Sequence, residues 1–290
     1  MKNIPDLTSP RIVRALFEEC GLQPRKQLGQ NFLIDANIVR KIAACVDARP
    51  GDAVIEVGPG AGALTHALAL SGADLLAVEV DRGLAALLND LFQPWPKVRI
   101  LHQDILKITW TDLISRFFPA SASIKLVSNL PYVISGPFIY ALLKESFPFE
   151  SAVLMLQKEV AHRLVAAPGD SDYGGLSVLC QYYTSGKILF DVTHNVFWPR
   201  PKVGSAVLKL EPGRRELAAK EEEQLWFLVQ GVFQQRRKTM LNSLLRLLPH
   251  PRNLIISLME EAQVDPAIRP EQLNVRQFAK LAQITYNYPN

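Results

Sequence analysis

The stretch AVIEVGPGAGALT, residues 53–65, decides the fold. A short apolar run is followed by glycines at positions 58, 60 and 62, and then by a segment with helix-like periodicity. Glycines at a strand-to-helix turn let the backbone approach a ligand, and the next helix offers free N–H groups at its start. The stretch therefore predicts a strand, a ligand-binding turn and a helix.

The same alternation continues along the chain. Short apolar runs separated by helical segments of about 10–15 residues indicate βαβ units and a mostly parallel sheet. Two later strand-like runs are joined by the short, proline-rich VFWPRPKVG, which suits a hairpin and predicts at least one antiparallel strand. The parallel runs are LLAVEV, VRIL, IKLVSN and SAVLMLQ, and the later pair is KILFDVTH and SAVLKLE.

The character of the sequence changes at EPGRREL, residues 211–217. Beyond it the chain shows helix-like periodicity and no strand signal. We predict an α/β domain over residues 1–211, with an N-terminal arm at 1–50, and a small all-helical domain over residues 212–290.

Composition narrows the class of protein. The 290 residues are 48% hydrophobic and 21% charged, as in soluble globular proteins. No apolar run approaches the roughly 20 residues that span a bilayer, and no secretory signal is expected at the start. Cys20, Cys45 and Cys180 are too far apart in sequence to indicate a disulfide framework or a metal site, so a reducing, cytoplasmic compartment is expected.

The net charge of +4 is unevenly placed, because the positive excess lies at the two ends of the chain. Basic ends around a neutral centre favour a phosphate-rich partner, although ordinary surface scatter explains the charge equally well.

The glycine turn alone does not identify the ligand. Gly58, Gly60 and Ala63 satisfy the spacing of a dinucleotide fingerprint. Glu79 follows Gly58 by 21 residues and can accept both hydroxyls of a ribose in any adenosine cofactor. Asp104, after the next strand, can accept from an adenine amino group or simply cap a helix. These residues predict an adenosine cofactor without choosing its chemistry.

The motif SNLPYVIS, residues 128–135, makes that choice, together with Glu56 and Asp104. An exocyclic adenine amine is a poor nucleophile, and two acceptors on its N–H bonds would hold its nitrogen nearer tetrahedral geometry. The side-chain oxygen of Asn129 and the main-chain oxygen of Leu130 can serve as those acceptors.

The next two residues of the motif support this interpretation. Pro131 fixes the local backbone, and Tyr132 offers a face for base stacking worth about 1–3 kcal/mol. A dehydrogenase has no use for the motif, whereas an adenine N6-methyltransferase does. Such a transfer needs mainly positioning, so no metal and no histidine base are expected.

Taken in order, the motifs of this chain resemble the KsgA-type small-subunit rRNA adenine dimethyltransferases, within the family of rRNA adenine N6-dimethylases. The resemblance covers nearly the whole chain. It implies a Rossmann-like, class I fold that uses S-adenosylmethionine. The motifs are KQLGQNFLID, IEVGPGAGALT, SNLPYVIS, LMLQKEVAHRL, YGGLSVLCQYY, FWPRPKVGSAV and FQQRRKTMLNSL.

The resemblance also implies roles for cofactor-binding residues. Asn31 and Leu33 would border S-adenosylmethionine from the N-terminal side. Gly58 would approach its methionine part, Glu79 its ribose and Asp104 its adenine.

Further residues are implied at the substrate. Asn129 would sit at the reacting amine, and Phe197 would sandwich the target base opposite Tyr132, unless Phe197 is only a core aromatic. Trp198 stands where relatives often carry a smaller or polar residue, which leaves open which of the two rings stacks on the base.

By resemblance, the substrate is 16S rRNA in the small ribosomal subunit, at two adjacent adenosines in the loop of its 3′-terminal hairpin. Each would become N6,N6-dimethyladenosine, as part of ribosome biogenesis. Arg236, Arg237 and Lys238 would open the second helix of the C-terminal domain and contact phosphates, although adjacent charges often form only a solvated face. A monomer without a membrane partner is expected.

Three other functions stay open at this point. A large-subunit, 23S rRNA adenine methylase shares the cofactor site and a similar Asn-x-Pro-aromatic motif. The protein could also act chiefly as a ribosome-assembly factor with methylation secondary. A nicotinamide oxidoreductase is the third alternative.

The oxidoreductase alternative has a direct test. A ligand that binds only the folded state raises the melting temperature. We expect S-adenosylhomocysteine to raise it and NADH to leave it unchanged in a thermal-shift measurement. The reverse result would restore the oxidoreductase.

Overall fold

The computed structural model describes residues 4–119, 123–234 and 238–288. The chain divides into two compact units, Met1–Ala161 with Lys187–Pro212, and His162–Gly186 with Gly213–Asn290. The division after Pro212 lies next to the predicted boundary.

Residues 162–186 differ from the prediction, because they join the second unit and not the first. Helix α8 (Gly175–Tyr183) packs on α9 (Ala219–Phe233) and α12 (Val275–Tyr286). The hydroxyl of Tyr173 also donates to the main-chain oxygen of Leu273 at 2.8 Å.

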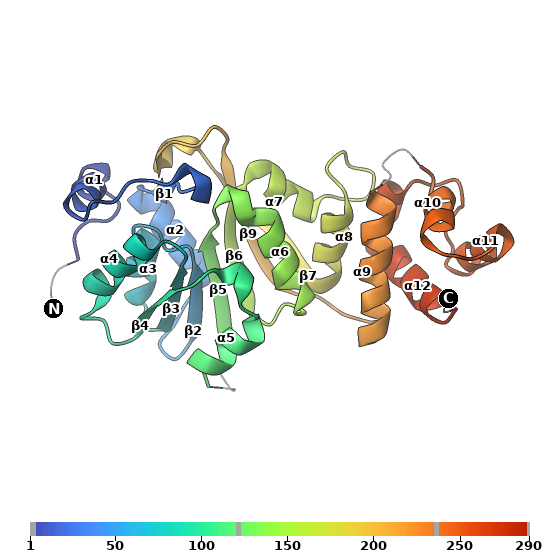
Figure 1. Ribbon diagram of the computed structural model, residues 1–290, viewed down its shortest axis with the longest axis horizontal. Helices are drawn as coiled ribbons and strands as arrows, with labels where there is room; N and C mark the ends of the chain where they lie inside the picture. The colour runs from blue at the N-terminus through green and yellow to red at the C-terminus, as the bar shows by residue number, and fades with distance from the viewer. Residues whose placement is uncertain (1–3, 120–122, 235–237, 289–290) are drawn as a thin grey trace. The chain divides into compact units, whose positions relative to one another are not determined.

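A seven-stranded sheet in the order β4-β3-β2-β5-β6-β9-β7 forms the centre of the first unit (Figure 1). Neighbouring strands from β4 to β6 run parallel, and β9 is antiparallel to β6, which confirms the predicted mixed sheet. The strands are β2 (Ala53–Val57), β3 (Asp74–Glu79), β4 (Val98–His102), β5 (Ile124–Asn129), β6 (Ser151–Gln157), β7 (Thr184–Val192) and β9 (Ser205–Pro212).

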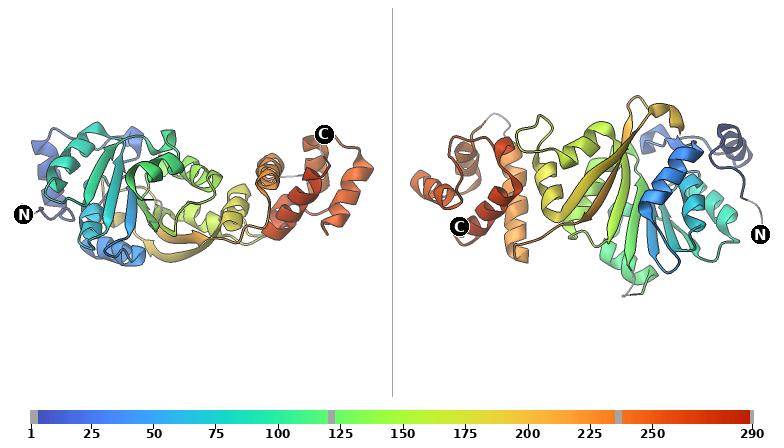
Figure 2. Two further views of the ribbon diagram at one scale, coloured as in Figure 1. Left: turned by 90° about the horizontal axis from the view of Figure 1, so that it is seen from below. Right: turned by 180° about the vertical axis from the view of Figure 1, so that it is seen from behind.

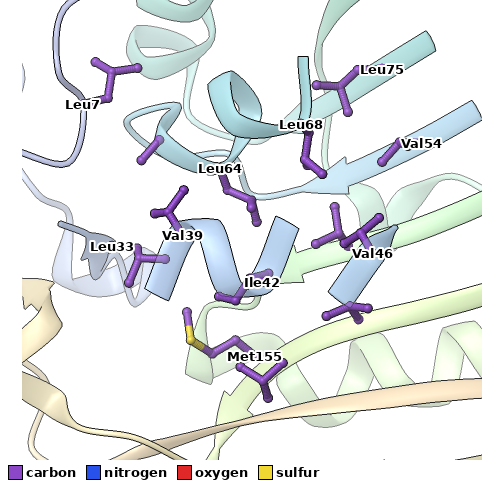
Figure 3. Packing of buried hydrophobic residues seen from close by; sticks show 14 of the residues in the cluster. Leu7, Leu33, Val39, Ile42, Val46, Val54, Leu64, Leu68, Leu75 and Met155 are labelled. Carbon is purple, nitrogen blue, oxygen red and sulfur yellow. The ribbon is translucent and has the colours of Figure 1, made fainter. Parts of the chain in front are cut away.

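Helices cover both faces of the parallel part of the sheet (Figure 2), so its central strands are mostly apolar. All five residues of β2 are buried. Apolar side chains of α2 and α3, including Ile42, Leu64 and Leu68, pack over Val54 of β2 (Figure 3). The helices of this unit are α1 (Pro10–Glu19), α2 (Ala36–Val46), α3 (Ala63–Ala69), α4 (Arg82–Phe92), α5 (Trp110–Phe117) and α6 (Ser135–Lys144), and α7 (Lys158–Val165) crosses the division.

The strand order reverses at β2. From β2 the chain continues through β3 to β4 on one side, and β5 then pairs with the other edge of β2. Ligands of open α/β sheets bind outside the carboxyl ends of the strands at such a reversal. The pairing of Val57 with Ser128 places the next residues, Gly58 and Asn129, at the same edge of the sheet.

A separate two-stranded sheet lies beside this edge. It pairs β1 (Phe32–Leu33) antiparallel with β8 (Phe197–Trp198). The N-terminal arm and the segment between β7 and β9 are thereby joined.

The second unit is helical over its described residues beyond 213 and also contains α10 (Met240–Leu247) and α11 (Arg252–Glu261). Glu222 of α9 is buried and accepts hydrogen bonds from Nε and Nη2 of Arg215, at 2.8 and 2.6 Å, and from the hydroxyl of Tyr182 at 3.1 Å. This network ties α8, α9 and the segment before α9 together. Within the described residues, no helix combines the length and apolar character needed to cross a bilayer.

The turn that leads into α3 gives a stability prediction. Gly62 has φ +88°, and an added Cβ would lie 2.8 Å from Cδ2 of Leu88. Gly62→Ala should therefore lower the free energy of unfolding by about 1–3 kcal/mol in urea titrations. The control is Gly136→Ala in α6, where an added Cβ meets no heavy atom within 4 Å, and stability should hold or rise by up to about 1 kcal/mol. Equal effects of the two substitutions would contradict the steric argument.

Candidate active site

The carboxyl ends of the parallel strands open into a cavity of about 1260 Å³, including its solvent-filled mouth. Nine residues singled out from the sequence line this one cavity, although they come from six separate places in the chain. They are Asn31, Leu33, Gly58, Glu79, Asp104, Asn129, Leu130, Tyr132 and Phe197.

Gly58 lies where the turn after β2 meets the motif after β5. Its N–H donates to the main-chain oxygen of Val78 at 2.9 Å, and its φ is +69°. An added Cβ would lie 3.6 Å from Cδ of Pro131 and 3.9 Å from the main-chain oxygen of Asn129. Glycine thus meets the backbone requirement and leaves the space in front of these residues open.

Glu79 ends β3 as a buried carboxyl in the cavity wall. Oε1 accepts from the N–H of Asp81 at 2.9 Å, and Oε2 accepts from the N–H of Gly60 at 3.2 Å. Burial raises its pKa to about 7. Each oxygen has a further lone pair, so two ligand hydroxyls can still be accepted.

Glu56, in β2, is a second buried carboxyl in this wall, with 1% of its surface exposed. Burial raises its pKa to about 8; the Thr65 side chain partly opposes this shift, and the nearby Glu79 carboxylate adds to it. Oε2 has no hydrogen-bond partner within the described residues. A buried carboxyl oxygen without a partner beside a cavity fits a ligand that can form a hydrogen bond with it. Sequence reasoning used Glu56 only to interpret the turn and did not count it among the site residues.

Asp104 follows β4 and caps the short 3₁₀ helix η2 (Ile105–Lys107). Oδ1 accepts from the N–H of Leu106 at 3.1 Å, and Nζ of Lys107 lies 3.8 Å from Oδ2. The capping role considered from the sequence is therefore real. The residue lines the cavity at the same time, with 34% of its side chain exposed.

Asn129 is fixed by a bond to the N-terminal arm. Its Nδ2 donates to the main-chain oxygen of Asn31 at 3.2 Å. A carbonyl only accepts, so this partner assigns the amide nitrogen to that side and leaves Oδ1 as the acceptor for a ligand. The N–H of Leu130 donates to the main-chain oxygen of Met155 at 3.1 Å, which holds the next peptide in place.

Tyr132 and Phe197 are two of the three aromatic residues of the described chain that line the cavity, and Phe32 is the third. The hydroxyl of Tyr132 shares a 2.7 Å hydrogen bond with Oγ of Ser205, and burial raises its pKa. Phe197 pairs with Leu33 in the two-stranded sheet and belongs to the apolar core while also lining the cavity.

Trp198 packs elsewhere, edge-on to Phe17 with ring centroids 5.5 Å apart and with the Arg14 guanidinium 5.4 Å from its ring centroid. Successive strand residues face opposite ways. Phe197 is therefore the ring of this pair that lines the cavity.

The predicted basic cluster is only partly described. Arg236 and Arg237 lie outside the described residues. Lys238 is exposed and precedes Thr239, whose hydroxyl caps α10. Within the described chain, no three His, Cys, Asp or Glu side chains group as a metal site would require.

Comparisons with known proteins agree with this geometry. The family model described as ribosomal RNA adenine dimethylase matches residues 21–286. Two relatives named "Ribosomal RNA small subunit methyltransferase A" are similar over nearly their whole length. The one from Moorella thermoacetica is 42% identical over 281 residues, 95% of this chain and 97% of the relative. The one from Pediococcus pentosaceus is 39% identical over 285 residues, 97% and 96% of the two chains.

Solved structures of rRNA-modifying and related methyltransferases have a similar fold. A dimethyladenosine transferase from Plasmodium falciparum superposes with a TM-score of 0.71 at 25% identity, over 85% of this chain and 94% of that one. The 23S rRNA methyltransferase ErmE gives 0.65 at 25% identity, over 88% and 99%. Fold and site thus define a Rossmann-like methyltransferase of class I. The chain belongs to the ribosomal RNA adenine dimethylase family.

The raised pKa of Glu56 predicts how stability depends on pH. A carboxyl that holds its proton more tightly when folded stabilises the fold at low pH, and this stabilisation is lost as pH rises from about 4.5 to about 8. Glu56→Gln replaces the carboxyl by an amide that does not ionise, so the variant does not lose stability as pH rises. Without ligand, the variant should therefore be more stable than the parent at pH 8, by on the order of a few kcal/mol. The difference in the free energy of unfolding between variant and parent, measured by urea titration, should become smaller toward pH 5.

The matched control is Glu19→Gln on α1, an exposed carboxyl of the same unit. As a surface substitution, it should change the free energy of unfolding by no more than about 0.5 kcal/mol. Parallel pH profiles for the parent and Glu56→Gln would contradict the assignment of a proton to Glu56.

Proposed function

We propose that this protein transfers methyl groups from S-adenosylmethionine to the N6 atoms of two adjacent adenosines in the loop of the 3′-terminal hairpin of 16S rRNA. Each adenosine becomes N6,N6-dimethyladenosine. The observation that carries the proposal is the motif of residues 129–132 at the end of β5, beside Gly58 and in one cavity with Glu79. The names of the two relatives described above favour the small subunit.

The cavity residues fit the cofactor. Gly58 leaves room for the methionine part, Glu79 has lone pairs for the ribose hydroxyls, and Asp104 can accept from the adenine amino group. Asn31 and Leu33 border the same space from the N-terminal side. When bound, S-adenosylmethionine supplies a methyl group that its sulfonium makes strongly electrophilic.

The chain's own contribution is to hold the target amine. In the first transfer, Oδ1 of Asn129 and the main-chain oxygen of Leu130 would accept the two N–H bonds of the amine and direct its lone pair at the methyl carbon. The bond from sulfur to methyl breaks as the bond to nitrogen forms, S-adenosylhomocysteine leaves, and the nitrogen gives up one proton to solvent. In the second transfer one N–H remains for these acceptors. Tyr132 and Phe197 offer faces for the base, worth about 1–3 kcal/mol per stacked base. A base in a loop needs the least free energy to enter such a cavity, because it is already unpaired. Positioning of this kind accelerates transfer without a metal or a general base.

The second unit is proposed to bind the surrounding RNA. Arg236, Arg237 and Lys238 would contact phosphates, which makes binding fall as salt rises. The protein would act as a monomer in the cytoplasm during small-subunit biogenesis.

The likeness to ErmE keeps 23S rRNA as the second candidate substrate. Incubating the protein with unmethylated small and large subunits and labelled methyl donor separates the two. Label in the large subunit alone would overturn the small-subunit assignment.

Asn129→Ala tests the mechanism. Loss of Oδ1 removes one of two acceptors on the amine, and we expect transfer to small subunits to fall by at least about 100-fold, the scale of one lost transition-state hydrogen bond in a preorganised site. Filter binding of the same subunits should change little, since the substitution leaves the second unit intact.

The control is Asn89→Ala, an amide on α4 whose Nδ2 donates to the main-chain oxygen of Ala85 within its own helix. It should keep full activity. Unchanged transfer in Asn129→Ala would remove Asn129 from the mechanism, and loss of subunit binding along with transfer would favour an assembly role for this surface.

A further inference from the structure

Residues 25–33 form a segment, here called the strap, that borders the cavity on its N-terminal side. Seven consecutive residues, 27–33, line the cavity without a break. The strap contains the 3₁₀ helix η1 (Lys26–Leu28) and strand β1, joined by Gly29 at φ +62°. Such a run is held in place by few hydrogen bonds of its own, so its outside contacts decide its position.

One end of the strap is fastened to a single buried carboxylate oxygen. Nε of Arg25 lies 3.1 Å from Oδ2 of Asp81, and Nε2 of Gln30 donates to the same oxygen at 3.4 Å. The N–H of Arg25 also donates to Oε1 of Gln30 at 2.7 Å, which closes the loop between them. The side chain of Asp81 is only 4% exposed, whereas that of Arg25 is 62% exposed.

Asp81 is also connected to the proposed cofactor wall. Its Oδ1 caps α4 by accepting from the N–H groups of Gly83 and Leu84, at 2.8 and 3.2 Å. Its own N–H donates to Oε1 of Glu79. The carboxylate that holds the strap therefore belongs to the same turn as the carboxyl proposed to hold the ribose.

The other end of the strap reaches the proposed target side. The main-chain oxygen of Asn31 accepts from Nδ2 of Asn129, and the Asn31 side chain donates back to the main-chain oxygen of Gly29 at 3.0 Å. If the strap shifts, the amide of Asn129 loses the partner that sets which of its atoms faces a ligand.

We propose that Arg25 and Asp81 are positioning residues for methyl transfer. Their ion pair holds the strap so that Asn31 orients the amide of Asn129, and it links the cofactor side of the cavity to the side that holds the target amine. The inference rests on the proposed function, because it assigns these residues a part in that reaction.

The first test is Arg25→Ala, assayed with unmethylated small subunits and S-adenosylmethionine. We expect kcat to fall on the order of tenfold, with a rise in KM for the cofactor of similar size. Arg25→Lys keeps a cation near Asp81 and should restore part of both parameters. A purely structural role would lower the melting temperature and leave kcat per folded molecule unchanged.

The second test is a double-substitution cycle. Asp81→Asn keeps Oδ1 for the helix cap but replaces Oδ2 by a group that cannot accept from Arg25. If Arg25 acts through Asp81, the double variant should be no slower than Asp81→Asn alone. Additive losses would overturn the pairing, and should Asp81→Asn fail to fold, the comparison of Arg25→Ala with Arg25→Lys decides the proposal.

Arg49→Ala is the matched control. Arg49 and Asp47 form a 2.8 Å ion pair with both side chains largely exposed, and neither residue lines the cavity. This variant should keep the parent's kcat and KM. If the parent protein methylates small subunits and Arg25→Ala does so equally fast, only the positioning role is refuted. If the parent protein methylates neither subunit, the proposed function itself is refuted.

Discussion

The adjacency of β2 and β5 is the constraint on which the site depends. Because the strand order reverses at β2, the glycine turn and the Asn129 motif leave the sheet side by side although they are 71 residues apart in sequence. Parallel pairing sets their register. The hydroxyl of Ser128 adds a side-chain hydrogen bond across the pair, donating to the main-chain oxygen of Val57 at 2.6 Å. The residues that carry the proposed chemistry therefore start from a fixed edge of the sheet.

Two buried carboxyl groups determine the electrostatics of this edge of the sheet. Glu56 and Glu79 both lie in the cavity wall, and burial disfavours the charged form of each. Glu79 is partly compensated by two main-chain N–H groups, whereas Glu56 keeps one oxygen without a partner in the described residues. A ligand group that hydrogen-bonds with Glu56 would supply the partner that the described residues do not.

Much of the fold could be predicted from the sequence, because short apolar runs between helical segments have few other solutions. The strand over residues 53–57 and the one ending at Asn129 follow directly from that pattern. The place of residues 162–186 could not be predicted, since α8 is recognised as part of the second unit only through helices that come much later in the chain.

Cofactor-side residues such as Gly58 and Glu79 were found by spacing along the strands. The arrangement of Arg25 and Asp81 was not, because an ion pair between residues 56 positions apart leaves no local pattern. The choice between Phe197 and Trp198 likewise required the pairing of β8 with β1, which sets the direction of each ring.

The second unit is assembled from two pieces of sequence, and this affects how the chain is made. Helix α8 is synthesised early, but its partners α9 and α12 follow only after β9. Until α12 leaves the ribosome, the apolar side of α8 lacks its final neighbours. The nascent chain therefore has to keep that helix from misassociating over the translation of about a hundred residues, a demand that a contiguous domain would not face.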